Sequence, residues 1–150
     1  MKHGKVEFEY SQITKYIYIG TNQCCEDHFE ESLLKKGIRA DISLEEERID
    51  APWGVNFFLW LPTKNHRAPT LKQFLIAVNV LKDLEKLCMK VYIHCERGHG
   101  RAPTLVAAYL AVTKNISVDE AIKFIKKKRS VIHINKTQRN AIIKALPLFS

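Results

Sequence analysis

The sequence lacks long apolar stretches and has few cysteines, prolines and glycines. Its 150 residues include 4 cysteines, 5 prolines and 6 glycines. No apolar run is long enough for a membrane-spanning helix. The charged residues after Met1 do not resemble the apolar segment of a secretion signal. Internal repeats, low-complexity tracts and linkers are also absent. We therefore expect a single domain over residues 1–150, a monomer, and a cytoplasmic location.

The cysteines show no spacing typical of a disulfide framework or of a metal site. They lie at Cys24, Cys25, Cys88 and Cys95. In a reducing compartment we expect free thiols, since the adjacent pair could form only a strained vicinal bond. Cys88 falls in a helical pattern and is expected to be buried, with a redox role beside Cys95 as the alternative. The sequence implies no metal and no cofactor.

Basic residues outnumber acidic ones, 24 to 16, which gives a net charge of +8. Such a charge attracts acidic partners, phosphorylated substrates included. Much of the excess lies in residues 123–129, which we interpret as a solvated helix face with one apolar stripe. Nucleic acid or an anionic membrane is the less favoured partner, because no aromatic residues interleave with the basic ones.

Apolar periodicity predicts strands that alternate with helices. Strands are expected at 16–19, 38–43, 55–61 and 91–93, and helices at 26–36, 71–87, 102–110, 117–125 and 137–146. Capping boxes begin two of these helices, at Thr70 with Gln73 and at Ser117 with Glu120. The pattern predicts an α/β fold, with a central, mostly parallel sheet flanked by helices on both faces.

Residues 94–101, His-Cys-Glu-Arg-Gly-His-Gly-Arg, join the expected strand at 91–93 to the helix that follows. A strand–loop–helix unit of this kind directs backbone N–H groups and the positive helix end at an anion. A thiolate at Cys95 is a nucleophile, and the planar fork of Arg101 matches two oxygens of a tetrahedral oxyanion. The expected substrate-binding residues between them are Glu96, Arg97, Gly98, His99 and Gly100.

This loop resembles the signature of the cysteine-dependent protein tyrosine phosphatase superfamily, in its small dual-specificity branch. Weaker similarities follow in order along the chain, at 16–20, 37–44, 58–62 and 133–138. The resemblance implies a protein tyrosine phosphatase-like fold. It also implies a phosphomonoesterase that forms a thiophosphate on Cys95. Its substrate would be a phosphorylated protein or a small phosphomonoester.

Supporting roles are expected for three residues outside the loop's centre. His94 is expected to hold the cysteine loop by a hydrogen bond, not to act as a base. The resemblance assigns Asn135 and Gln138 to supporting the loop or orienting water, although a polar helix start explains them equally well. Arg97 and His99 would favour a substrate with more than one phosphate, unless they are simply solvated loop tips.

Two positions depart from the family pattern. Ala102 replaces the usual hydroxyl residue after the arginine, as in plant glucan phosphatases, and predicts slower hydrolysis of the phosphoenzyme. Asn65 occupies the position of the family's general acid, and losing an acid costs about 10²–10⁴ in rate. His66 is a replacement candidate because histidine titrates near neutrality, and Asp41 and Asp50 are weaker ones.

Two other functions remain as alternatives. The first is a catalytically weak phosphate-binding module, which the missing acid and hydroxyl would explain. The second is a basic protein on a phosphatase scaffold that acts on RNA 5′-phosphates or phosphoinositides, which the charge of +8 would explain.

Overall fold

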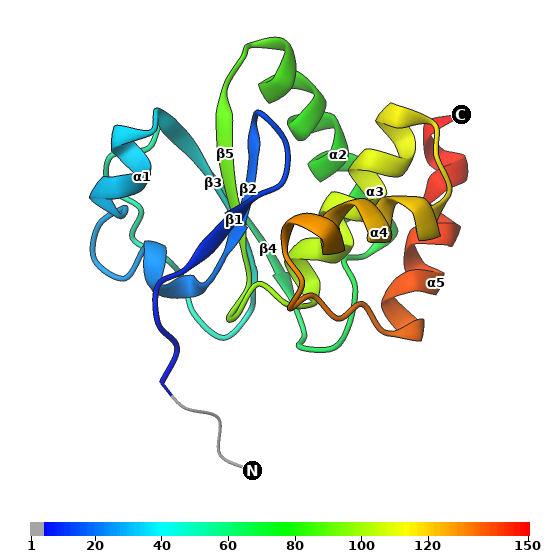
Figure 1. The fold of residues 1–150 in the computed structure, drawn as a ribbon, viewed down its shortest axis with the longest axis horizontal. Helices are drawn as coiled ribbons and strands as arrows, with labels where there is room; N and C mark the ends of the chain where they lie inside the picture. The colour runs from blue at the N-terminus through cyan, green and yellow to red at the C-terminus, as the bar shows by residue number, and fades with distance from the viewer. Residues whose placement is uncertain (1–4) are drawn as a thin grey trace.

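The computed structural model describes residues 5–150, and the elements follow one another as an α/β chain (Figure 1). The strands are β1 (Tyr10–Gln12), β2 (Ile17–Gly20), β3 (Ile38–Glu45), β4 (Phe57–Thr63) and β5 (Lys90–His94). The helices are α1 (Glu31–Lys35), α2 (Leu71–Lys86), α3 (Arg101–Lys114), α4 (Val118–Lys128) and α5 (Lys136–Ala145). Two 3₁₀ turns complete the set, η1 (Asn22–Cys24) and η2 (Leu146–Phe149).

The five strands form one sheet in the order β1-β2-β5-β3-β4. Only the edge strand β1 is antiparallel; β2, β5, β3 and β4 run parallel. β5 is central, with Ile93 beside Ile19 on one side and Ile42 on the other. Because ligands bind at the carboxyl ends of parallel strands, the end of β5 places the following loop where a site is expected.

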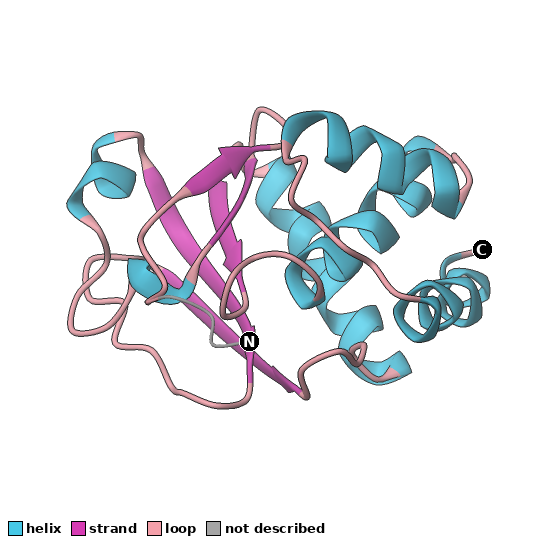
Figure 2. Ribbon diagram, turned by 60° about the horizontal axis from the view of Figure 1, so that its bottom comes forward, coloured by secondary structure: helices cyan, strands magenta, loops and turns pink. Residues whose placement is uncertain are grey.

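Alternating side chains give the sheet two buried faces. Ile19, Ile42 and Ile93 point into a large core beneath α2–α5. Tyr18 and Tyr92 point the other way, into a smaller core with α1 and η1. Figure 2 shows the long helices gathered on one side of the sheet, with short helical turns and long loops on the other. The predicted fold class is confirmed, with an unequal division of the helices.

α3 lies at the centre of the larger core. Its residues from Arg101 to Ala111 are all buried, and apart from Arg101 and Thr104 this stretch is apolar on every side, as a helix inside a core requires. The Thr70–Gln73 capping box before α2 is confirmed, with both reciprocal hydrogen bonds present. Before α4 only half of the box forms. Ser117 accepts a hydrogen bond from the Glu120 N–H, but its hydroxyl donates to the Glu120 carboxylate.

Several local predictions are wrong. The helix expected at 26–36 is only the five residues of α1, because the exposed charged residues 26–28 have no core to pack against. β1 was not expected at all, being a short edge strand. Cys88 is exposed in the turn after α2, where its φ of 56° ends the helix. Cys24 and Cys25 are joined by a disulfide and are not free thiols.

The location and the domain count stay predictions. Within residues 5–150, none of the helices combines the length and the apolar character that a bilayer crossing requires.

Candidate active site

The loop between β5 and α3 has a backbone that only glycine permits at one position. Gly98 has a φ of +70°, and a Cβ there would lie 2.5 Å from the carbonyl oxygen of Gly20. Gly100 precedes α3 and provides no side-chain cap. The first N–H groups of this 14-residue helix therefore remain for a ligand. Cys95, at the loop's start, is 3% exposed.

Arg101 is the first residue of α3 and is 2% exposed. Its Nη1 donates to both carboxylate oxygens of Glu47, at 2.9 and 3.0 Å, and to the Thr63 carbonyl at 2.8 Å. Glu47 follows β3 and Thr63 ends β4, so a residue of the loop after β3 and the last residue of β4 together fix the Nη1 group of the guanidinium. Nε and Nη2 are left as the donors for an oxyanion, as a bidentate contact requires.

Arg129 holds the loop from its other side. It is buried at the end of α4, where Nε donates to the Gly98 carbonyl and Nη2 to the Arg97 carbonyl, both at 2.9 Å. Its Nη1 donates to Glu9 at 2.9 Å and to Ser11 at 3.1 Å. The sequence interpretation placed Arg129 on a solvated face, which is wrong for this residue. Its guanidinium fixes the loop of residues 95–100, which we call the phosphate loop, to β1.

We expect Arg129→Met to destabilise the fold and to lower activity together. The variant keeps much of the volume but leaves buried carbonyls without donors, at a cost of about 3 kcal/mol in the free energy of unfolding. Chemical denaturation and kcat/KM would measure both effects. Lys127→Met, which removes an exposed charge from the same helix end, is the matched control. Equal stability of the two variants would contradict this role.

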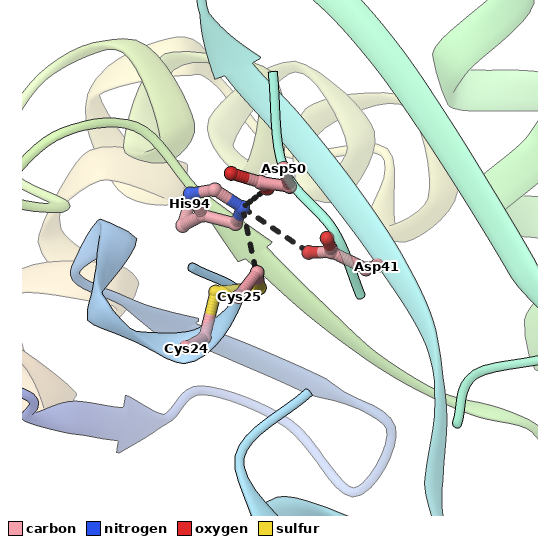
Figure 3. Close-up of side chains that lie close together, drawn as sticks. All are labelled: Cys24, Cys25, Asp41, Asp50 and His94. Atoms are coloured by element: carbon pink, nitrogen blue, oxygen red, sulfur yellow. Dashed lines mark hydrogen bonds and ion pairs between the residues drawn. A yellow bond between two sulfur atoms is a disulfide. The ribbon is translucent and has the colours of Figure 1, made fainter. Parts of the chain in front are cut away.

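His94 ends β5 and lies wholly buried behind the loop. Its Nδ1 is 3.2 Å from the Cys95 carbonyl, while Nε2 lies 2.6 Å from Asp50 Oδ2 and 3.2 Å from Asp41 Oδ1 (Figure 3). The geometry agrees with the expectation that His94 holds the cysteine loop. Burial acts to lower the pKa of His94, but the two carboxylates outweigh it and raise the pKa well above its ordinary value.

Asp41 and Asp50 are therefore not placed as acids for the reaction. Both side chains are buried beside His94 and neither lines the cleft described below. Burial raises the pKa of Asp41 to about 6, although His94 acts to lower it. These two weaker candidates for the general acid are ruled out by their position.

Asn65 and His66 follow β4 on an exposed loop at the cleft. The His66 N–H donates to Asn65 Oδ1 at 3.0 Å, and His66 has a φ of 65°. Asn135 donates to the His66 carbonyl at 2.9 Å, and Gln138 donates to the Arg67 carbonyl at 3.1 Å. Asn135 and Gln138 thus hold this loop in place, besides forming the capping box of α5.

The cleft over Cys95 has a volume of about 640 Å³. It brings the loop, the Asn65–His66 segment and the start of α5 together with two residues near the N-terminus. Its lining residues are Lys5, Val6, Asn65, His66, Cys95, Glu96, Arg97, His99, Gly100, Arg101, His133, Asn135 and Gln138. Gly98 is not among them. A Cβ at Gly98 would meet Gly20 and Arg129, and its expected role in substrate binding stays a prediction.

Sequence reasoning missed Glu47 and Arg129. A signal for Glu47 existed, since a buried arginine needs a carboxylate and residues 45–47 are all glutamate. Nothing in the spacing of Arg129 distinguishes it from the three lysines before it.

Comparison with known proteins agrees with this geometry. The family model "Dual specificity phosphatase, catalytic domain" matches residues 17–145. Dual specificity protein phosphatase 5 of Rattus norvegicus is 29% identical over 129 residues, which cover 83% of this chain and 32% of that protein. Dual specificity protein phosphatase 4 of Gallus gallus is 32% identical over 71 residues, which cover 47% of this chain and 19% of that protein. The chain thus spans a third or less of these relatives.

Among solved structures, that of PTPMT1 superposes with a TM-score of 0.79 at 28% identity, covering 94% of this chain and 96% of the other. The family match covers most of the chain and contains the whole phosphate loop. The chain therefore belongs to the dual specificity phosphatase family, as a catalytic domain of that family.

Proposed function

We propose that the protein is a cysteine-dependent phosphomonoesterase of the dual-specificity type. The observation that carries the proposal is that the buried Cys95 and the Arg101 guanidinium, which Glu47 and Thr63 hold in place, line the same cleft. The Cys95 thiolate attacks phosphorus, and the alcohol or phenol departs with a proton. Water then attacks the thiophosphate and releases phosphate and the thiol. Arg101 and the α3 N-terminus stabilise the charge on the phosphoryl oxygens in both steps.

Ala102 supports a slow second step. It is fully buried and has no hydroxyl to assist the departing thiolate. Thr104, two residues on, donates its hydroxyl to the Gly100 carbonyl at 2.7 Å, so that hydroxyl is already used within the helix. A transient thiophosphate on Cys95 is expected to accumulate, and a burst of product in the first turnover would reveal it.

The open cleft supports a phosphorylated protein or a small phosphomonoester as substrate. A phosphoinositide is the second candidate, because Lys5 and Arg97 add basic groups to the lining. A structure of PTPMT1 "in complex with PI(5)P", 26% identical over 93% of this chain at a TM-score of 0.78, supports the same candidate. Monomeric state stays a prediction.

A substrate panel tests the proposal directly. Phosphate release would be measured from phosphotyrosine and phosphoserine peptides, PI(5)P and 5′-phosphorylated RNA, under reducing conditions and without added metal. Release from the peptides supports the dual-specificity assignment, and release from PI(5)P alone supports the lipid. Phosphate that binds without any turnover would overturn the proposal in favour of a phosphate-binding module.

Asn65→Asp is expected to restore a general acid. An aspartate at this exposed position in the cleft donates a proton to the departing oxygen, which an amide cannot do. We expect the rate on alkyl phosphates to rise about 10–100-fold, and the rate on aryl phosphates to change little, since phenols leave without help. A limb in which the rate falls with rising pH should also appear, because the acid must carry its proton.

The matched variant is His66→Ala. If His66 already donates the proton, this change removes an existing limb of the wild-type pH profile. Equal acceleration of both substrate classes by Asn65→Asp would show that the acid position is elsewhere.

A further inference from the structure

Five buried side chains with metal-ligating atoms meet behind the phosphate loop (Figure 3). One atom from each lies within 4.8 Å of the others, and the set is Cys24, Cys25, Asp41, Asp50 and His94. These residues come from η1 and its end, from β3, from the loop before β4 and from the end of β5. The proposed reaction uses His94 only to hold the loop and leaves the other four unexplained.

Too many acceptors converge on one atom of this cluster. His94 Nε2 faces Asp50 Oδ2 at 2.6 Å, Asp41 Oδ1 at 3.2 Å and Cys25 Sγ at 3.9 Å. An imidazole nitrogen carries at most one hydrogen, so it cannot serve both carboxylates fully. All four carboxylate oxygens are buried, and among residues 5–150 none has a partner with hydrogen-bond geometry, although Asp41 and Asp50 are in ion-pair contact with His94. Arg48 lies 3.6 Å from Asp50 Oδ1, beyond hydrogen-bond distance. Burying two carboxylates without hydrogen-bond donors costs free energy, and a divalent cation between them would lower that cost further than the single charges of His94 and Arg48 do.

The other ring nitrogen of His94 supports a ligand role. Nδ1 lies 3.2 Å from the Cys95 carbonyl, where only a protonated Nδ1 makes a hydrogen bond. When an ion binds at Nε2, the proton leaves that nitrogen while the proton on Nδ1 stays, and the lone pair of Nε2 then points into the cluster. Ligating histidines in metal sites are oriented in the same way, by a hydrogen bond from the distal nitrogen to a carbonyl or carboxylate.

The disulfide determines when the cluster can bind. Cys24 and Cys25 are bonded to each other, and a disulfide sulfur is a poor ligand compared with a thiolate. A dithiol reductant transfers two electrons and two protons to the bond, yielding two thiols and its own disulfide. Cys25, the nearer cysteine to His94, then loses its proton as it binds the ion. The resulting donor set has one sulfur, one nitrogen and two oxygens, which matches tetrahedral zinc.

We propose that, once the Cys24–Cys25 disulfide is reduced, Cys25, Asp41, Asp50 and His94 bind one zinc ion directly behind the phosphate loop. One thiolate and two carboxylates carry three negative charges against the two positive charges of the ion, and Arg48, 3.6 Å from Asp50 Oδ1, offsets the remaining one. A surface cavity of about 350 Å³, formed by residues 50–58, includes Asp50 in its lining. Through His94 the ion would brace the Cys95 carbonyl. The site does not rest on the proposed phosphatase activity.

Zinc and cobalt titrations test the site in the full chain. Cys95→Ser serves as the background, so that the thiol in the cleft cannot bind the metal. After reduction and removal of the reductant, affinity and stoichiometry come from competition with a chromophoric chelator. Cobalt adds a sulfur-to-metal charge-transfer band and the visible bands of tetrahedral coordination. We expect one ion per reduced chain, with the thiolate band present.

Three comparisons decide the outcome. Cys25→Ser and Asp50→Asn should each weaken binding at least about 100-fold, more than loss of an outer-shell partner does. Cys88→Ser, which removes the exposed cysteine, should leave binding unchanged. The disulfide-bonded chain should bind at least about 100-fold more weakly than the reduced chain, a test that needs no folding of the ligand variants. No binding by the reduced chain, or binding insensitive to both ligand variants and to oxidation, would overturn the site.

Discussion

Cys95→Ser is expected to abolish phosphate release while leaving oxyanion binding intact. The nucleophile in this chemistry is a thiolate, and a serine hydroxyl, which stays protonated at neutral pH, cannot replace it. Removing a nucleophile costs about 10⁴–10⁶ in kcat. The contacts that fix the cleft, from Arg101 to Glu47 and from Arg129 to the loop carbonyls, do not involve the Cys95 sulfur. The substitution should therefore lower kcat and leave the free energy of unfolding unchanged.

Hydrolysis of p-nitrophenyl phosphate across pH 4.5–8.5 provides the measurement, with inorganic phosphate binding followed in parallel. Cys88→Ser is the matched control, because it makes the same change at an exposed cysteine outside the cleft. Substantial turnover by Cys95→Ser would place the nucleophile elsewhere and contradict the proposed mechanism. Loss of both turnover and phosphate binding would indicate that the variant disturbs the loop itself.

The parts that the sequence predicted well are those encoded by neighbouring residues. The apolar run before Cys95, the glycines after it and Pro103 in the next helix define a strand, a turn and a helix within about 20 residues. The structure has β5, the loop and α3 in that order. The paired polar residues at Thr70 and Gln73 likewise marked the first turn of α2 correctly.

The parts that it did not predict depend on residues far apart in the chain. Arg129 fixes a loop 31 residues before it, and Glu47 pairs with an arginine 54 residues later. Contacts between residues so far apart in the sequence produce no periodic pattern from which they could be predicted. Asp41 is one of the weaker general-acid candidates from the sequence, and its position in the fold excludes that role. As a strand residue on the face opposite Ile42, it points into the smaller core and not toward the cleft.

The short α1 shows that helix propensity alone does not predict the length of a helix. Residues 26–36 are rich in charged residues with good helix propensity, yet propensity does not stabilise a helix without a buried face. Only Leu33 of α1 is buried, and Phe29 before it occupies the smaller core from a non-helical segment. Tertiary packing therefore limits the helix to residues 31–35.

Arg101→Lys is expected to reduce kcat/KM about 10³-fold, although it preserves the charge. The guanidinium has two tasks: Nη1 bonds Glu47 and the Thr63 carbonyl, and the proposed mechanism assigns Nε and Nη2 to the oxygens of the substrate. A lysine ammonium is a single point and cannot satisfy both sets of partners. Its pairing with Glu47 would withdraw it from the substrate. Loss of one such stabilising donor in a preorganised site costs 10²–10³, and a transition-state arginine contributes about 10³–10⁵.

Whether the loss falls on kcat or on KM shows whether Nε and Nη2 of Arg101 stabilise the transition state or only bind the substrate. A fork that matches the transition state better than the ground state predicts a loss mainly in kcat. Glu47→Gln, which keeps an acceptor for Nη1 but removes its charge, should cost only about 10-fold, because the arginine stays in place. Arg139→Lys, at the exposed ion pair with Asp119, controls for the substitution itself. If Arg101→Lys retained activity within a few-fold of wild type, a positive charge alone would be sufficient. The argument from the planar fork would then fail, even with Cys95 established as the nucleophile.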